Sequence, residues 1–189
     1  MILPIVLYGN DVLRQKGRVV HEITHEIEQL AANMLETMEA HDGVGLAAQQ
    51  IGLALQMAVV DISGAEDRPS QMWINSTEVD PSQYMPMILI NPEIHPIKTR
   101  DIDVEGCLSF PGVSGKIARS KKVRVTATNL KGETFEFEAA GLLGRAIQHE
   151  HDHLQGILFI DHMTPQDRQA MKPTIEVIRK KGAASSAQG

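Results

Sequence analysis

Cysteine is nearly absent from this sequence: its 189 residues include only one, Cys107. No disulfide bond can form within the chain, which favours a reducing compartment. Long apolar runs are missing too, since no stretch approaches the ~18 residues that a membrane-spanning helix needs. The N-terminal residues lack the basic and apolar regions of a signal peptide. These absences predict a cytoplasmic protein that is not inserted in a membrane.

Positive charge is also scarce. The 18 Lys and Arg residues are outnumbered by 24 Asp and Glu residues, which gives a formal net charge of −6. Nucleic acids and anionic lipids bind basic patches, so the composition indicates no site for either. Hydrophobic residues make up 42% of the chain, which is typical of a globular protein. We expect one folded domain over residues 1–181 and a disordered tail over the small and polar residues 182–189.

Apolar residues recur at steps of three and four over residues 25–40 and 141–155, which predicts two amphipathic helices. Gly156 is suited to end the second helix, because glycine readily adopts the left-handed conformation. A third helix is expected from Pro165, since proline is favoured at the first helical position. Pro173 lacks an amide hydrogen and is expected to break or kink that helix.

Shorter segments rich in apolar and β-branched residues predict strands over 56–62, 87–90, 123–128 and 134–138. Asn91-Pro92 is expected to end the second strand, and Asn129-Leu130-Lys131-Gly132 predicts a hairpin between the last two. Residues 63–82 are polar and contain two prolines, which predicts a long loop. Because strands and helices do not alternate regularly, the expected fold class is α+β.

The strongest chemical signal is His149-Glu150-His151-Asp152-His153, which contains H-E-x-x-H inside the second predicted helix. Residues four apart lie one above the other on a helix, so His149 and His153 can bind one metal ion. Both lie on the apolar side of the helix, and Glu150 lies in the adjacent apolar row. A buried carboxylate without a partner is costly, so Glu150 needs a metal or a substrate beside it. The segment predicts a metal site.

A catalytic site of this type has a third protein ligand and leaves a fourth position open for water. The candidates are Cys107, the other histidines and distant carboxylates. Cys107 lies in Glu105-Gly106-Cys107-Leu108-Ser109, and its thiolate would be a strong ligand for Zn²⁺ or Fe²⁺. Five other histidines have no comparable setting and are interpreted as surface or ordinary polar residues: His21, His25, His41, His95 and His162. His151, beside the ligands, is expected to face the solvent.

A third segment, Gly43-Val44-Gly45-Leu46-Ala47-Ala48-Gln49-Gln50, follows the first predicted helix. Its small residues allow the backbone to approach another group closely. It does not have the features of a nucleotide-binding loop, because no strand precedes it and Gly-Lys-Ser/Thr is missing. Two interpretations stay open: the segment only ends the helix, or it also presents the amide of Gln50 to a substrate oxygen.

These three segments, in this order, resemble the motifs of the peptide deformylases: G-x-G-x-A-A-x-Q, E-G-C-x-S and Q-H-E-x-D-H. The chain matches every conserved letter, at residues 43–50, 105–109 and 148–153. Three further residues are similar to the bacterial type: Pro111, Gly112 and Arg119. The resemblance covers most of the chain. It implies an α+β fold of a single domain, in which antiparallel strands surround a central metal-binding helix.

The resemblance also implies a reaction: removal of the formyl group from the N-terminal formylmethionine of nascent polypeptides, with release of formate. It implies Cys107, His149 and His153 as the metal ligands and Glu150 as the general acid and base. One divalent metal per chain is expected, with Fe²⁺ as the native ion and Zn²⁺, Ni²⁺ or Co²⁺ able to replace it.

Further roles follow from the same resemblance. Gln50 and the backbone N–H of Leu108 would stabilise the oxyanion, and Gly45 would hold the substrate backbone. Walls for the methionine side chain are expected from Leu46, Leu142 and Ala146. Arg145 stands where some relatives carry an apolar pocket residue, which leaves the side-chain preference open. Nascent formylmethionyl peptides are the expected partners, together with a transient association with the ribosome.

Two other protein classes share part of this pattern. A zincin-like peptidase also carries H-E-x-x-H, but a cysteine ligand upstream of the helix is unexpected there. A protein with a structural metal usually surrounds it with four protein ligands, whereas three are evident here. An inactive deformylase relative is disfavoured because Glu150 and Gln50 are both present. Formate release from a formylated peptide would separate these alternatives.

Overall fold

The computed structural model describes residues 1–97 and 99–186. Its helices are α1 (His25–Ala40), α2 (Gly141–Leu154) and α3 (Pro165–Ser186), and its 3-10 helices are η1 (Asp11–Arg14), η2 (Ala48–Ile51), η3 (Pro81–Tyr84) and η4 (Phe159–His162). The strands, in chain order, are β1 (Gly45–Ala47), β2 (Met57–Val60), β3 (Ser70–Ile74), β4 (Thr77–Val79), β5 (Met87–Pro96), β6 (Arg100–Gly106), β7 (Ser114–Ser120), β8 (Lys122–Thr128) and β9 (Thr134–Ala140).

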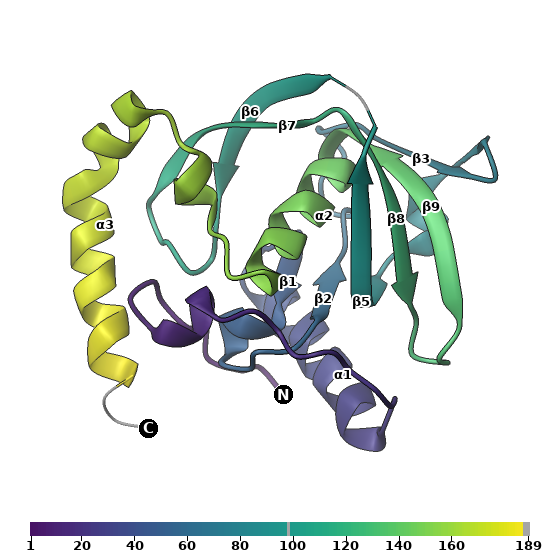
Figure 1. Cartoon of the computed structure of the whole chain (residues 1–189), viewed down its shortest axis with the longest axis horizontal. Helices are drawn as coiled ribbons and strands as arrows, with labels where there is room; N and C mark the ends of the chain where they lie inside the picture. Colours follow the sequence, from purple (N-terminus) through teal and green to yellow (C-terminus); the bar gives the residue numbers. More distant parts are fainter. Residues whose placement is uncertain (98, 187–189) are drawn as a thin grey trace.

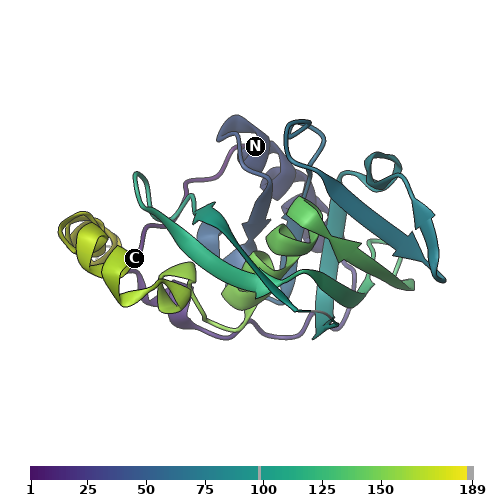
Figure 2. The same cartoon turned by 90° about the horizontal axis from the view of Figure 1, so that it is seen from above.

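Antiparallel pairing arranges seven of these strands in the order β1-β2-β5-β8-β9-β3-β4, while β6 and β7 form a separate antiparallel ribbon. Figure 1 shows α2 at the centre of the molecule, with the sheet on one side and the ribbon across another. Figure 2 shows α3 at the periphery, beyond the ribbon. This is the predicted α+β arrangement of antiparallel strands around a central helix.

The two strongest helix predictions are confirmed. α1 has the expected bounds, and the hydroxyl of Thr24 caps it by accepting a hydrogen bond from Ile27 N–H. α2 ends one residue before the predicted limit, and Gly156 follows it with a φ of +74°. Leu143 and Ile147 of α2 are fully buried against the sheet. Burying a side chain of this size stabilises the fold by about 1.5–3 kcal/mol, so packing rather than helix propensity holds α2 in place.

The prediction of one long loop over residues 63–82 is wrong. Within it, β3 pairs with β9, and β4 pairs with β3 through a turn in which Asn75 and Ser76 have φ angles of +49° and +64°. Only Met72 of β3 is fully buried. The polar composition concealed the strand, because one buried residue in five gives too weak an alternation to detect.

Two prolines disturb the secondary structure less than predicted. β5 does not end at Asn91-Pro92, because the register shifts there and pairing with β8 resumes at Glu93. α3 runs through Pro173 without a break. The proline leaves the carbonyl of Gln169 without its helical partner, and both residues are exposed, so that water can hydrate this carbonyl.

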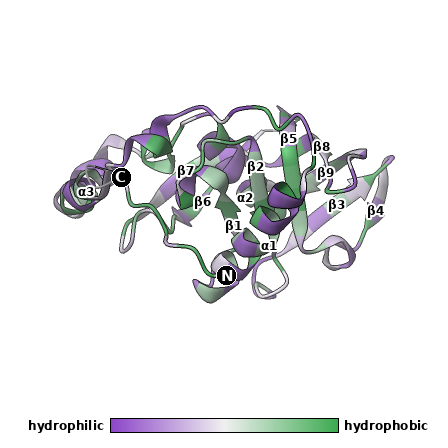
Figure 3. Cartoon of the chain, turned by 90° about the horizontal axis from the view of Figure 1, so that it is seen from below, coloured by the Kyte–Doolittle hydropathy of each residue, from purple (hydrophilic) through white to green (hydrophobic). Residues whose placement is uncertain are grey.

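The C-terminal region also differs from the sequence expectation. Residues 182–186, expected in a disordered tail, continue α3, and Gly182 packs closely on the backbone of Tyr8. Residues 187–189 lie outside the described residues. Figure 3 colours β5 predominantly as hydrophobic and much of α3 as hydrophilic. Over residues 1–97 and 99–186, no helix is both long and apolar enough to cross a membrane.

Candidate metal centre

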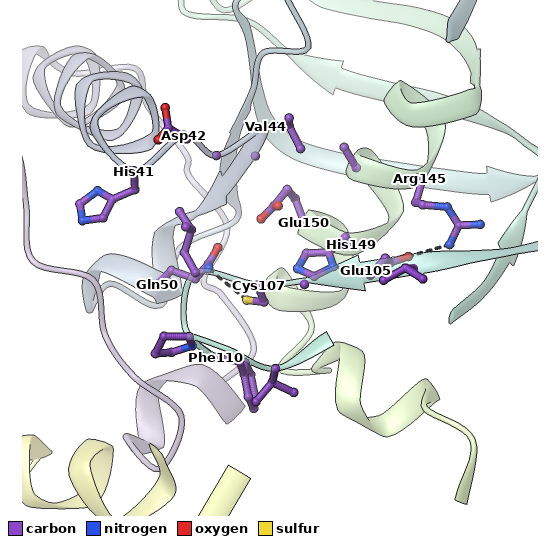
Figure 4. Close-up of a pocket in the computed structure, with 18 of the residues that line it drawn as sticks. His41, Asp42, Val44, Gln50, Glu105, Cys107, Phe110, Arg145, His149 and Glu150 are labelled. Atoms are coloured by element: carbon purple, nitrogen blue, oxygen red, sulfur yellow. Dashed lines mark hydrogen bonds and ion pairs between the residues drawn. The ribbon is translucent and has the colours of Figure 1, made fainter. Parts of the chain in front are cut away.

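Three potential metal ligands converge beside the C-terminal half of α2. His149 and His153 lie one helical turn apart, and Cys107 directly follows β6. Their ligand atoms all lie within 4.8 Å of one another, and Sγ of Cys107 is 3.4 Å from Nε2 of His153. Both histidines are buried, whereas Cys107 is partly exposed. The cluster therefore has one side open to the solvent-accessible cavity shown in Figure 4.

This donor set fits a divalent transition metal. A thiolate and two imidazoles are ligands suited to Fe²⁺ or Zn²⁺, and three protein ligands leave one coordination position open. Burial, reinforced by His149, lowers the pKa of His153 well below its ordinary value. The imidazole of His153 is therefore neutral, which is the form that binds a metal.

Glu105 orients His149. Its Oε1 lies 2.9 Å from Nδ1 of His149, which leaves Nε2 of this histidine as the ligand atom. Burial lowers the pKa of His149, but hydrogen bonds with Cys107 and Glu105 outweigh burial and raise this pKa well above its ordinary value. The surroundings of the ring thus favour a positive charge, and a bound metal ion would supply one in place of a proton.

Two guanidinium groups hold Glu105 in turn. Arg119 donates to both carboxylate oxygens at 2.9 Å, and Arg145 donates to Oε2 at 2.8 Å. Burial raises the pKa of Glu105, but the hydrogen bonds from His149 and Arg119 outweigh it and hold the pKa well below its usual range. Glu105 is consequently a permanent anion, positioned by three donors from β7 and α2.

The ion network extends from Arg119 to the surface. Asp152 accepts from Nη1 of Arg119 at 2.5 Å and lies 2.8 Å from Nε2 of His162. Arg119 is only 5% exposed, so its charge depends on these two carboxylates for compensation. His162, interpreted from the sequence as a surface or ordinary polar histidine, is exposed and forms the outer end of this network.

Glu150 has a different environment from the other acidic residues. Its Oε2 is buried and, within the described part of the chain, no group donates a hydrogen bond to it. Burial raises the pKa of this carboxyl to about 7, although the neighbouring His149 opposes the shift. A carboxyl that titrates near neutrality can both accept and return a proton. Glu150 also lies with Cys107 and His149 along one cavity.

Gln50 and Leu108, the two proposed oxyanion donors, both line the same cavity. Nε2 of Gln50 lies 3.4 Å from Sγ of Cys107 and 3.3 Å from Oγ of Ser109, and Ala47 N–H donates to its Oε1 at 3.0 Å. The backbone N–H of Leu108 has no acceptor among the described residues. The hydrogen bond that Oε1 accepts fixes the orientation of the Gln50 amide group. A fixed side-chain N–H and an unpaired backbone N–H are the types of donor that stabilise a developing oxyanion.

A cavity of about 570 Å³ opens above the cluster. Gly45, Leu142 and Ala146 line it, together with Val44. Leu46 does not line it, because alternation along β1 directs this side chain into the core beneath α1. Figure 4 shows Val44 near Glu150 on the wall of this cavity.

Some site residues were missed by the sequence analysis. His41, interpreted as a surface or ordinary polar residue, is exposed and also lines the cavity with Asp42 and Arg68, and nothing in the local sequence indicates this second position. The ion network around Glu105 was also missed, although one signal was available. Arg119 lies two residues after Ile117 in β7, so both side chains are on the buried face of this strand. A charged residue at a buried strand position needs a charged partner.

The chain is similar to known proteins over nearly its full length. Residues 2–169 match the family model described as polypeptide deformylase. A peptide deformylase of Methylacidiphilum infernorum (isolate V4) is 45% identical over 180 residues, which cover 95% of this chain and 94% of that relative. One from Acinetobacter baumannii (strain SDF) is 41% identical, covering 94% and 92%. The crystal structure of the Thermotoga maritima peptide deformylase superposes with a TM-score of 0.74 at 35% identity and covers 87% of this chain and 99% of its own.

Proposed function

The chain belongs to the polypeptide deformylase family and removes the N-formyl group from nascent polypeptides, and we propose how its own residues divide this work. The observation that supports the proposal most directly is the position of Glu150. Its carboxylate is buried, receives no hydrogen bond on Oε2 from the described residues, and lines the same cavity as the metal ligands Cys107 and His149. Such a group is costly for the fold and is explained by a catalytic role.

Cys107, His149 and His153 would hold the metal, with Glu105 orienting His149 through Nδ1. A bound divalent ion supplies Lewis acidity, which makes a water molecule a stronger nucleophile at neutral pH. We propose Fe²⁺ as the native ion, because the thiolate and two imidazoles suit it, and Zn²⁺, Ni²⁺ or Co²⁺ as substitutes.

Glu150 is the general base and then the general acid. Its carboxylate accepts a proton from the attacking water and then donates one to the nitrogen of the leaving amine. Burial raises the pKa of this carboxyl toward neutrality, which suits both transfers. Nε2 of Gln50 and the N–H of Leu108 stabilise the oxyanion that forms on the formyl oxygen. One such donor can lower the barrier by about 3 kcal/mol.

Gly45 holds the substrate backbone close to Glu150, and the first side chain of the substrate extends along α2 over Ala146 and Leu142. Both are small or apolar, and burial of a methionine side chain there contributes about 1.5–3 kcal/mol. A formyl carbon carries only hydrogen, so a narrow site admits it and excludes larger acyl groups.

The test is release of formate by the metal-loaded protein. Formyl-Met-Ala is expected to yield formate and free Met-Ala in equal amounts, whereas Met-Ala is expected not to be cleaved. Metal analysis after anaerobic purification is expected to give about one Fe²⁺ per chain. Peptide-bond cleavage in unformylated peptides would instead favour a peptidase, and formate release without any metal would overturn the ligand assignment.

We propose a transient association with the ribosome in the cytoplasm, where nascent substrates emerge. α3 lies at the periphery (Figure 2) and carries five exposed basic residues: Arg168, Lys172, Arg179, Lys180 and Lys181. Ribosomal RNA attracts such charges. Co-sedimentation with ribosomes at low salt, lost when Lys172, Lys180 and Lys181 are replaced by Glu, is the expected result. No co-sedimentation of the unaltered protein would reject this association.

A further inference from the structure

One end of the cavity beside the metal ligands is lined by two arginines, Arg68 and Arg145. A second cavity of about 530 Å³ adjoins it, and both are lined by Arg68, Leu142 and Arg145. The boundary between the two cavities therefore carries two guanidinium groups beside one leucine. Figure 4 shows Arg145 reaching from α2 toward Glu105, on the far side of His149 from Cys107.

Arg145 is rigidly held and still has unused donors. It is only 8% exposed. Nη1 donates to Oε2 of Glu105 and to the carbonyl of Ile117, both at 2.8 Å, and Nη2 donates to the carbonyl of Asp101 at 3.1 Å. A guanidinium has five N–H donors, so Nε–H and one N–H of Nη2 have no acceptor among the described residues. Both unused donors belong to a side chain that lines the cavity.

The position of Arg145 along α2 determines which part of a bound substrate lies near it. It precedes His149 by four residues, about one helical turn or 5.4 Å, and Ala146 lies next to it. In the proposed substrate arrangement, the formyl group lies at Glu150 and the first side chain extends over Ala146. A side chain as long as methionine would then extend toward the part of the cavity that Arg145 lines.

We propose that Arg145 determines specificity by donating a hydrogen bond to an acceptor at the end of the substrate's first side chain, so that peptides beginning with N-formylmethionine sulfoxide are also substrates. This inference rests on the proposed function. A sulfoxide oxygen is polar, and an apolar pocket would reject it because its hydrogen bonds to water would be lost. Arg145 replaces that lost hydrogen bond, whereas the thioether of methionine accepts only weakly.

Arg145 is a better candidate for this role than Arg68. Arg68 is bound to Asp103 at 2.8 Å, but its side chain is 40% exposed and comes from the loop before β3. It can turn away from the cavity without breaking a buried contact. Arg145 cannot, because three buried or partly buried hydrogen bonds fix its plane. Arg68 therefore serves as the matched control.

The experiment compares three formylated tripeptides that differ only in the first residue: methionine, methionine sulfoxide or norleucine. Norleucine replaces sulfur by a methylene group and has no acceptor, so it isolates the hydrogen bond from the effect of length. The full chain, loaded with one divalent metal, is assayed for formate. We expect kcat/KM for the sulfoxide peptide to be at least one-tenth of that for the norleucine peptide. A lower ratio overturns the proposal.

Substitution then tests the residue. Arg145→Met keeps the length of the side chain and removes its donors, and the sulfoxide-to-norleucine ratio is expected to fall at least fivefold. Arg145→Lys retains a donor and is expected to give an intermediate ratio. Arg68→Met is expected to leave the ratio within twofold. Each ratio compares two substrates on the same protein preparation. A loss of metal or of folded protein lowers kcat/KM for both substrates equally and therefore does not change the ratio.

The outcomes separate this inference from the proposed function. An unchanged ratio in Arg145→Met, or a shift in Arg68→Met alone, overturns the role of Arg145 while formate is still released from the methionine peptide. Absence of formate from all three peptides would instead reject the proposed function. If Arg145→Met does not fold, the proposal is tested by the ratio in the unaltered protein and in Arg145→Lys. A ratio that is the same in these two proteins overturns the role of Arg145.

Discussion

Gly45 and Glu150 are in direct contact across β1 and α2. A Cβ atom at position 45 would lie 2.4 Å from Oε1 of Glu150 and 2.9 Å from its Cδ. Both distances are shorter than the contacts that Cβ atoms make in folded proteins. The carboxylate of Glu150 can therefore occupy this position only because residue 45 has no side chain. The close backbone approach expected of the glycine-rich segment is an approach to Glu150.

We predict that Gly45→Ala lowers kcat by about 10–100-fold and leaves metal content unchanged. The added methyl group displaces the Glu150 carboxylate, and a misplacement of about 1 Å can reduce a rate by about 10². The backbone at Gly45 is ordinary β-strand, so alanine causes no backbone strain. Gly64→Ala is the control, because a Cβ there meets no atom within 4 Å. A Gly45→Ala protein with normal kcat would show that the carboxylate can move without consequence.

Glu150→Ala should separate the proton-transfer role from metal binding. We expect near-stoichiometric metal and a loss of about 10²–10⁴-fold in kcat, the usual contribution of general acid–base catalysis. The measurement is metal analysis and formate release on the same preparation. Loss of the metal together with activity would make Glu150 a ligand or a support for the site.

The pH dependence of the unaltered protein should have an acid limb set by Glu150. Only the carboxylate form accepts a proton, so kcat/KM falls as pH drops through its pKa. Burial raises this pKa to about 7, and a cation held by Cys107, His149 and His153 lowers it again. We therefore expect the limb between pH 4.5, the ordinary value, and about 7. A rate that stays constant over this whole interval would contradict the assignment of Glu150 as the base.

Arg119→Met should damage the metal site from a distance. Arg119 joins Glu105 and Asp152, and its removal leaves one buried carboxylate, Glu105, and one half-buried carboxylate, Asp152, partly unpaired. Breaking a buried pair costs about 3–5 kcal/mol of unfolding free energy. Because Glu105 orients His149, metal affinity should also fall about 10–100-fold. Urea unfolding and a competitive metal titration measure the two effects. Unaltered affinity in a destabilised protein would limit Arg119 to a structural role.

The sequence predicted the parts of the site that depend on local periodicity. His149, Glu150 and His153 share a helix, so their relative positions follow from the spacing alone. The network of Glu105, Arg119 and Arg145 could not be predicted in this way, because it joins β6, β7 and α2 only after folding.

Leu46 was assigned to the cavity and lies in the core. β1 has only three residues, too few for alternation to show which face is buried. The register of a short strand depends on its partner, and β2 follows β1 only after the η2 turn. The same limit hid β3 in the expected loop, whereas the long β8–β9 hairpin was predicted correctly.

The last prediction concerns Cys107, the only cysteine and the proposed thiolate ligand. A thiolate is the form that reacts with oxidants, and Cys107 is partly exposed at the cavity. Fe²⁺ can itself be oxidised, whereas Zn²⁺ has no redox chemistry. We therefore expect dilute peroxide to inactivate the Fe²⁺ form faster than the Zn²⁺ or Ni²⁺ form. Peptide mass spectrometry should find Cys107 oxidised.

Cys107→Ser tests the ligand assignment on which that expectation depends. Serine presents a weak, protonated hydroxyl in place of a soft thiolate, so metal affinity should fall markedly. The two histidines alone would then hold the ion. If Cys107 were only a small buried thiol, serine would leave both metal content and formate release unchanged. A Cys107→Ser protein that keeps full metal and full activity would therefore place the third ligand elsewhere, and the peroxide sensitivity would need another cause.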